Sequence, residues 1–168
     1  MSSNAMSLPG SYFLPPRIIA NMPTPEKLTE IRATLDAVKT NSDDPDTQIG
    51  CVITDEYFNL LITGANRLPL GVSRLSHRTT RPAKYDFIMH SERYAIASAA
   101  KIGTDLEGGC IFLNWFPCAD CAQVIIQAGI KRLFAERDAL MSRVSDPRYK
   151  FSQAAEMLDD ASIQVIWW

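Results

Sequence analysis

The first regular pattern of apolar residues along the chain predicts a helix. Between Leu28 and Val38 the apolar residues recur at spacings near 3.6, as they do on one face of a helix. Thr24 and Pro25 directly precede this stretch, and threonine followed by proline is a typical helix start. We therefore expect a helix over about residues 24–40.

Beyond this helix the pattern alternates between extended and helical segments. Residues 49–54 and 59–63 are short β-favouring runs that predict a hairpin, whereas residues 66–86 predict a long loop. Further helices are expected over residues 90–101, 118–128 and 152–160, and further strands over residues 111–114, 133–135 and 163–167. The resulting order, α-β-β-α-β-α-β-α-β, predicts an α/β fold in which helices cover both faces of a five-stranded mixed sheet.

The domain organisation follows from the chain's length and the place of its prolines. We expect an irregular, proline-rich arm over residues 1–22 and a single domain over residues 23–168, long enough for one core without disulfides. No run approaches about 18 apolar residues, and no secretory signal pattern opens the chain, so neither a membrane span nor secretion is expected. Cys51 and Cys110 lie in apolar runs, which indicates small buried hydrophobes and a cytoplasmic protein.

The net charge of the chain indicates which class of ligand it binds. The formal net charge is -2, whereas a protein that grips a polynucleotide usually carries a basic face that neutralises phosphates. We therefore expect a small-molecule substrate rather than a polynucleotide.

Two short fragments carry the residues best suited to metal chemistry: His90-Ser91-Glu92 and Pro117-Cys118-Ala119-Asp120-Cys121. Cys118 and Cys121 are three residues apart at a predicted helix start, so their sulfurs can share one metal ion. His90 opens another predicted helix, and both helix dipoles favour thiolates and hydroxide in front of them. Three protein ligands leave the fourth zinc position to water, as catalytic zinc sites do.

Glu92 completes this set as a candidate general acid–base, because its carboxylate is expected beside the metal rather than on it. We predict one Zn²⁺ per chain, since residues 71–89 contain no cysteine and only His77 as a further histidine. Alternatives remain open at this point. A C-x-x-C pair alone also occurs in redox proteins and in structural zinc sites, so a zinc-stabilised binding module without turnover is a second hypothesis.

The order H-x-E…P-C-x-x-C resembles the signature of the cytidine and deoxycytidylate deaminase superfamily. The similarity runs over residues 42–168 and is closest to the deoxycytidylate branch, above all in residues 116–131. The resemblance implies a cytidine-deaminase-like α/β/α sandwich, a homo-oligomer, and zinc-dependent hydrolysis of a cytosine-type amino group with release of ammonia. Its most direct implication is a pyrimidine mononucleotide substrate such as dCMP; a nucleoside, a free base or a modified pyrimidine is the alternative.

The resemblance also implies roles for individual residues. It implies that the side chain of Asn66 hydrogen-bonds the substrate, although asparagine also favours turns, and that the backbone N–H of Ser91 contacts the pyrimidine carbonyl. Phe116 is expected either to line the base pocket or to pack in the core. The terminal pair, Trp167 and Trp168, is expected to cap the core or to lie at a subunit interface.

Two features bear on the choice of substrate. The superfamily motif commonly continues H-A-E-x-N, but this chain has Tyr94 in place of the asparagine. Tyr94 either borders the pocket and shifts the substrate preference, or turns into the core. Arg78 and Arg81 lie in the long loop with Arg74 and Lys84, and they form either a phosphate clamp or a solvated face of the loop.

Overall fold

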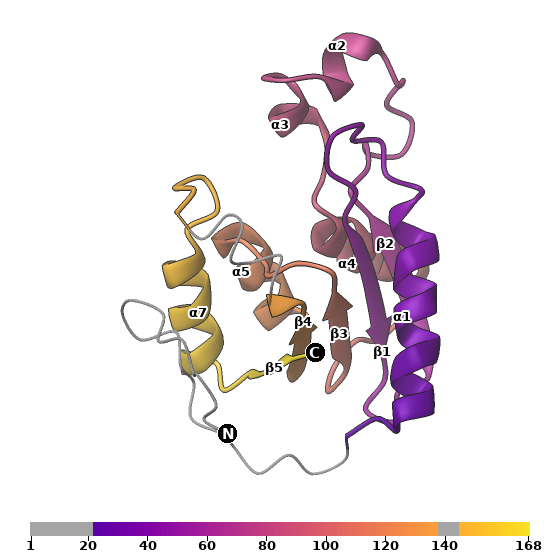
Figure 1. Cartoon of the computed structure of the whole chain (residues 1–168), viewed down its shortest axis with the longest axis vertical. Helices are drawn as coiled ribbons and strands as arrows, with labels where there is room; N and C mark the ends of the chain where they lie inside the picture. Colours follow the sequence, from indigo (N-terminus) through magenta and orange to yellow (C-terminus); the bar gives the residue numbers. More distant parts are fainter. Residues whose placement is uncertain (1–21, 138–144) are drawn as a thin grey trace, which may run out of the picture.

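The computed structural model describes residues 22–137 and 145–168 (Figure 1). The expected arm over residues 1–22 lies outside the described residues, except for Met22. The described helices and strands are, in order, α1 (Pro25–Lys39), β1 (Gly50–Thr54), β2 (Leu60–Ala65), α2 (Ser76–Thr79), α3 (Lys84–Phe87), α4 (Ser91–Ile102), β3 (Cys110–Leu113), α5 (Ala119–Gln127), β4 (Arg132–Ala135), α7 (Phe151–Asp160) and β5 (Gln164–Trp167). Within the described ranges, no helix has the length and apolar character needed to cross a membrane.

Every helix and strand predicted from the apolar pattern is present, with ends that differ by at most two residues. The first helix begins as expected, because the Oγ1 of Thr24 accepts a hydrogen bond from the backbone N–H of Lys27 and Pro25 is the first helical residue. The expectation of a long loop over residues 66–86 is wrong for two short stretches, since α2 lies within this range and α3 begins in it. Each is a single turn, too short to produce a helical period in the sequence.

The strands form one mixed sheet in the order β2-β1-β3-β4-β5. Strand β1 pairs antiparallel with both β2 and β3, whereas β3, β4 and β5 are mutually parallel. As a consequence, the start of β1 and the ends of β2 and β3 meet at one edge of the sheet. The hydrogen bond from the backbone N–H of Gly50 to the Oδ1 of Asn114, 2.7 Å long, joins two of these strand ends.

Helices cover both faces of this sheet, as the sequence predicted. On one face, α1 packs against Val52, Phe112 and Phe134, and the rings of the two phenylalanines stack with centroids 4.2 Å apart. On the other face, α4, α5 and α7 pack against residues that alternate with these, including Ile53 and Ile111. The α/β/α sandwich is therefore confirmed.

The two tryptophans, Trp167 and Trp168, cap the core through contacts with residues of the same chain. The ring of Trp168 packs edge-on against Phe112, and the guanidinium of Arg32 lies 4.4 Å from its centre. The ring of Trp167 stacks on Phe116 with centroids 5.5 Å apart. A place at a subunit interface stays a prediction for both residues.

A buried ion pair fixes α3 against the loop that precedes β1. Lys84 is only 2% exposed, and its Nζ lies 2.7 Å from the Oδ1 of Asp44 and 2.9 Å from the Oδ2 of Asp46. The same oxygen of Asp44 accepts hydrogen bonds from the backbone N–H groups of Asp46 and Thr47. This network holds the segment of α2 and α3, which projects beyond the end of the sheet in Figure 1.

Replacing the central carboxylate of this network should destabilise the protein strongly. Asp44→Ala leaves the buried ammonium of Lys84 with one partner and removes the oxygen that accepts two backbone hydrogen bonds, so we expect the free energy of unfolding to fall by about 3 kcal/mol. The matched control is Asp36→Ala, which removes an exposed ion pair with Lys39 and should cost at most about 1 kcal/mol. Urea unfolding measures both values. Equal losses in the two variants would contradict a structural role for the buried pair.

Candidate metal centre

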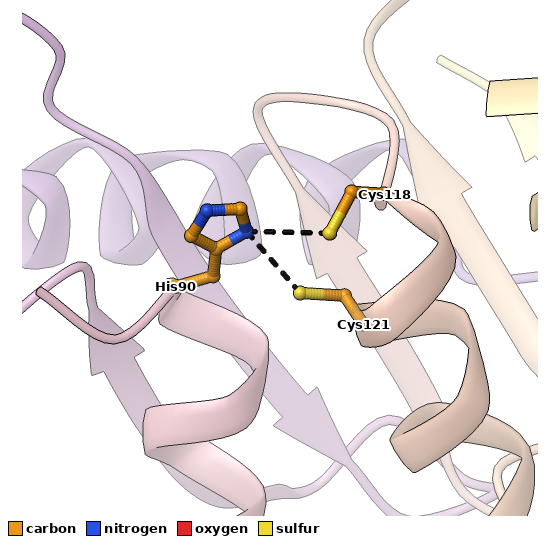
Figure 2. A group of neighbouring side chains, drawn as sticks. All are labelled: His90, Cys118 and Cys121. Atoms are coloured by element: carbon orange, nitrogen blue, oxygen red, sulfur yellow. Dashed lines mark hydrogen bonds between the residues drawn. The ribbon is translucent and has the colours of Figure 1, made fainter. Parts of the chain in front are cut away.

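The three predicted metal ligands lie at the starts of two neighbouring helices. His90 is the N-cap residue of α4 and Cys118 is the N-cap residue of α5, and both have extended backbone angles. Cys121 follows in the first turn of α5. Figure 2 shows the imidazole and the two thiol groups pointing toward one another from these helix ends. Helix starts therefore supply all three donors, as the spacing of the residues predicted.

The distances between the donor atoms fit a zinc ion. The Nδ1 of His90 lies 3.5 Å from the Sγ of Cys118 and 3.4 Å from the Sγ of Cys121, and the three atoms lie within 4.8 Å of one another. Tetrahedral zinc with bonds of about 2.0 Å to nitrogen and about 2.3 Å to sulfur separates such atoms by roughly 3.5 Å. One nitrogen and two sulfurs also form the donor set that zinc prefers.

The electrostatic environment prepares one thiolate for the metal. The hydrogen bond from Cys121 is the largest cause that lowers the pKa of Cys118 to about 4, and the hydrogen bond and charge of His90 add to it against the effect of burial. The same hydrogen bond, together with burial, raises the pKa of Cys121 well above the ordinary thiol value. Burial lowers the pKa of His90, but the contact with Cys118 and the charge of Glu92 raise it overall. Zinc binding displaces the remaining proton, because thiolates are the ligands.

Glu92 lies beside the three donors rather than among them. It is 5% exposed in the first turn of α4, and its Oε2 accepts a hydrogen bond of 3.0 Å from the hydroxyl of Ser91. Its carboxylate oxygens fall outside the set of ligand atoms that lie within 4.8 Å of one another. This position is suited to the expected acid–base role beside the metal, and that role stays a prediction.

A cavity opens in front of the donors, at the edge where β1 begins and β2 and β3 end. One part of its wall consists of charged or polar groups from the loop before β1, from the segment that leads into α3, and from α3 and α4. The other part consists mainly of aromatic rings from the segments next to α5 and α7. The lining residues are Asp44, Thr47, Ile49, Asn66, Arg81, Lys84, Tyr85, Ile88, His90, Ser91, Glu92, Trp115, Phe116, Cys118, Tyr149 and Phe151.

Asn66 lines the cavity and also holds its wall together. Its Oδ1 accepts a hydrogen bond from the backbone N–H of Ile49, and its Nδ2 donates one to the carbonyl of Thr47, both 2.8 Å long. The side chain thereby pins the loop before β1 to the end of β2. The expected contact between Asn66 and a substrate stays a prediction.

Ser91 and Phe116 both lie at the cavity. Ser91 is fully buried and is the first residue of α4, where backbone N–H groups have no acceptor within the helix. For Phe116 both predicted alternatives hold, because its ring lines the cavity and also packs against Phe151 and Trp167. A substrate contact stays a prediction for both residues.

Of the two loop arginines and Tyr94, only Arg81 is a lining residue of the cavity. Arg81 lines the cavity, with its Nε 3.4 Å from the Oδ2 of Asp46. Arg78 and Tyr94 are not among the lining residues. The guanidinium of Arg78 lies 5.4 Å from the ring centre of Phe87, and that of Arg67 lies 5.9 Å from the ring centre of Tyr94.

Sequence reasoning missed several aromatic side chains of the cavity. The position of Trp115, two residues before Pro117, could have indicated that this side chain lines the cavity. No local pattern marks Tyr149 or Phe151. They reach the cavity because the backbone N–H of Ala119, at the start of α5, donates a 3.0 Å hydrogen bond to the carbonyl of Tyr149.

Comparisons of the sequence with known proteins point to one family. The model of the family described as "cytidine and deoxycytidylate deaminase zinc-binding region" matches residues 25–137. An "uncharacterized deaminase in luxG 3'region" of Aliivibrio fischeri is 35% identical over 128 residues, which cover 75% of this chain and 82% of that protein. The deoxycytidylate deaminase of Homo sapiens is 34% identical over 103 residues, which cover 58% of this chain and 57% of that protein. The chain thus spans little more than half the length of this relative.

A solved structure has the same fold. The dCMP deaminase from the cyanophage S-TIM5, in complex with dCMP and dUMP, superimposes with a TM-score of 0.68 at 22% sequence identity. The alignment covers 88% of this chain and 100% of that chain. The arrangement of a five-stranded mixed sheet between helices is therefore the cytidine-deaminase-like fold that the sequence predicted.

The donor set predicts how the metal content responds to substitution. The protein should hold one zinc ion per chain, and Cys118→Ser or Cys121→Ser should lose it, because a hydroxyl replaces a thiolate ligand. Cys110→Ala is the matched control, since Cys110 is also buried but lies in β3 outside the donor set. Elemental analysis of purified protein gives the number of zinc ions per chain. Two zinc ions per chain, or full zinc content in Cys118→Ser, would contradict the assignment.

Proposed function

Because this chain belongs to the cytidine and deoxycytidylate deaminase zinc-binding family, it is a hydrolytic deaminase, and we propose that its substrate is a free cytosine-type ring compound. The first candidate is a pyrimidine mononucleotide such as dCMP. One observation carries the proposal: a buried carboxylate lines the same cavity as two of the three zinc donors, His90 and Cys118, and the third donor lies within 4.8 Å of them. A binding module without turnover has no need of this carboxylate.

In the proposed reaction, water adds to the ring carbon that bears the amino group, the C–N bond breaks, and ammonia leaves as the carbonyl forms. Zinc, when held by His90, Cys118 and Cys121, lowers the pKa of a coordinated water toward about 7. Glu92 accepts one proton from the water and delivers it to the ring nitrogen as the oxygen adds to the ring carbon. It then takes the proton of the added hydroxyl and passes it to the amine, which leaves as ammonia while the carbonyl forms. The hydroxyl of Ser91 donates to the Oε2 of Glu92 and so orients the carboxylate.

The aromatic side of the cavity suits a flat heterocycle. Phe116 and Trp115 offer ring surfaces near the donors, and such rings attract a planar, polarisable ligand. We propose that the amide of Asn66 and the backbone N–H of Ser91 supply the polar contacts that fix the ring's orientation. Both residues line the cavity, and helix N-terminal N–H groups are natural partners for a carbonyl oxygen.

The names of the relatives support a nucleotide substrate, since several are deoxycytidylate deaminases and one solved relative carries dCMP and dUMP. Arg81 is the cavity residue best placed for the phosphate, because half of its side chain is exposed and its contact with Asp46 is long. We also propose that the chain forms a homo-oligomer and does not act on polynucleotides.

A specific observation keeps the unphosphorylated substrate as a second candidate. The two lining cations, Lys84 and Arg81, already face the carboxylates of Asp44 and Asp46. A substrate phosphate would have to share Lys84 and Arg81 with the carboxylates that already neutralise their charges, which weakens its attraction to them. A nucleoside, a free base or a modified pyrimidine needs no such charge.

The Glu92→Ala variant separates metal binding from turnover. It should keep zinc and fold but release ammonia roughly 10²–10⁴-fold more slowly, because the proton shuttle is lost. The measurement is ammonia release from dCMP, CMP, cytidine, cytosine and guanine, with zinc content determined in parallel. Glu107→Ala serves as the control, since this exposed glutamate forms an ion pair with Lys131 on the surface and is not a lining residue of the cavity. Loss of zinc in Glu92→Ala would make Glu92 a ligand and overturn the mechanism.

The phosphate contact is tested by comparing two arginines of the same segment. Arg81→Ala should raise the KM for dCMP several-fold and leave that for deoxycytidine little changed, because only the nucleotide carries the phosphate. Arg78→Ala, outside the cavity lining, reports on the structure of the segment alone. Steady-state kinetics on both substrates decide the matter. Equal changes for dCMP and deoxycytidine in Arg81→Ala would refute a phosphate contact.

A further inference from the structure

Two tyrosines from different parts of the chain line the cavity. Tyr85 comes from α3, and Tyr149 comes from the loop that precedes α7; both are lining residues. In Figure 1, α3 and this loop lie at the same end of the molecule. We call these two residues and the neighbouring Arg148 the cavity mouth.

Arg148 connects the two sides of the cavity mouth. Its Cζ lies 4.8 Å from the ring centre of Tyr85 and 5.8 Å from that of Tyr149. The guanidinium is held in this orientation by a bidentate pair with Asp146, in which the Nε–Oδ1 and Nη2–Oδ2 distances are 2.9 and 2.5 Å. A planar cation between two aromatic rings contacts both.

Each end of this connection is attached to a well-packed part of the structure. On one side, the carbonyl of Tyr149 accepts the hydrogen bond from Ala119, the residue next to Cys118, and the Tyr149 ring stacks on Phe151. On the other side, Tyr85 adjoins the buried Lys84, whose ion pairs hold α3. Arg148 therefore connects the residue bonded to the start of α5, the helix of the two cysteine ligands, with α3 on the other side of the cavity.

We propose that Arg148 is a specificity-determining residue that restricts the enzyme to free monomeric substrates. The inference rests on the proposed function. A base within a polynucleotide must enter its pocket with the sugar-phosphate chain continuing on both sides. On this proposal, the contact of Arg148 with Tyr85, itself a lining residue, stands in the path of the continuing chain, whereas a single ring with one sugar passes it.

The experiment compares Arg148→Ala and Arg148→Lys with a matched control. Arg32→Ala removes an arginine of the same side-chain exposure, 48%, that also lies over an aromatic ring and faces a carboxylate. Neither Arg32 nor these two partners, Trp168 and Glu136, is among the lining residues. The first readout is the ratio of kcat/KM for dCMP to that for a dinucleotide with the same cytosine. We expect this ratio to fall about ten-fold in Arg148→Ala, to fall less in Arg148→Lys, and to be unchanged in Arg32→Ala.

The second readout does not depend on turnover. A bulky chelating dye, 4-(2-pyridylazo)resorcinol, must pass the cavity mouth to take zinc from the site, so Arg148→Ala should lose zinc to it several-fold faster than the wild type or Arg32→Ala. Unchanged ratio and unchanged dye rate in a folded Arg148→Ala would overturn the inference. If no substrate is deaminated, the proposed function fails, and the dye rates alone decide the role of Arg148.

Discussion

The convergence of one imidazole and two thiols in front of two helix starts is the constraint on which the rest of the site depends. It requires α4 and α5 to lie side by side on one face of the sheet with their N-termini at the same edge. Parallel pairing of β3 with β4 meets this requirement, because the chain leaves β3 at that edge and begins α5 a few residues later. The positive ends of both helices then stabilise thiolates at a single point.

The walls of the cavity are fixed by polar contacts on one side and by ring stacking on the other. The amide of Asn66 and the ion pairs of Lys84 hold the loop before β1, so the polar wall is ordered before any substrate arrives. Across from it, Phe116 and Phe151 belong to the same packed cluster as the core. A rigid cavity of this kind reduces the ordering cost of binding and favours one orientation of a flat ring.

The parts of the fold and of the site that could be predicted from the sequence are those encoded by the period of apolar residues and by the spacing of residues within short motifs. The apolar period of residues 28–38 and the alternating runs predicted α1 and all five strands, and the H-x-E and C-x-x-C spacings predicted which side chains meet. One-turn helices such as α3 leave no period to detect. The arrival of Tyr149 at the cavity depends on a hydrogen bond to Ala119, thirty residues earlier in the chain, and no local pattern encodes such a contact. The pairing of Tyr94 with Arg67 is equally non-local.

We expect this chain to hold zinc with three protein ligands and to leave the fourth position to water. X-ray absorption at the zinc edge of the purified protein measures this set of ligands. We predict two sulfur ligands at about 2.3 Å and two lighter ligands at about 2.0–2.1 Å, one of them the imidazole of His90, and an unchanged sulfur count in Glu92→Ala. A shell of three or four sulfurs, or a spectrum that loses a light ligand when Glu92 is replaced, would contradict an open catalytic site.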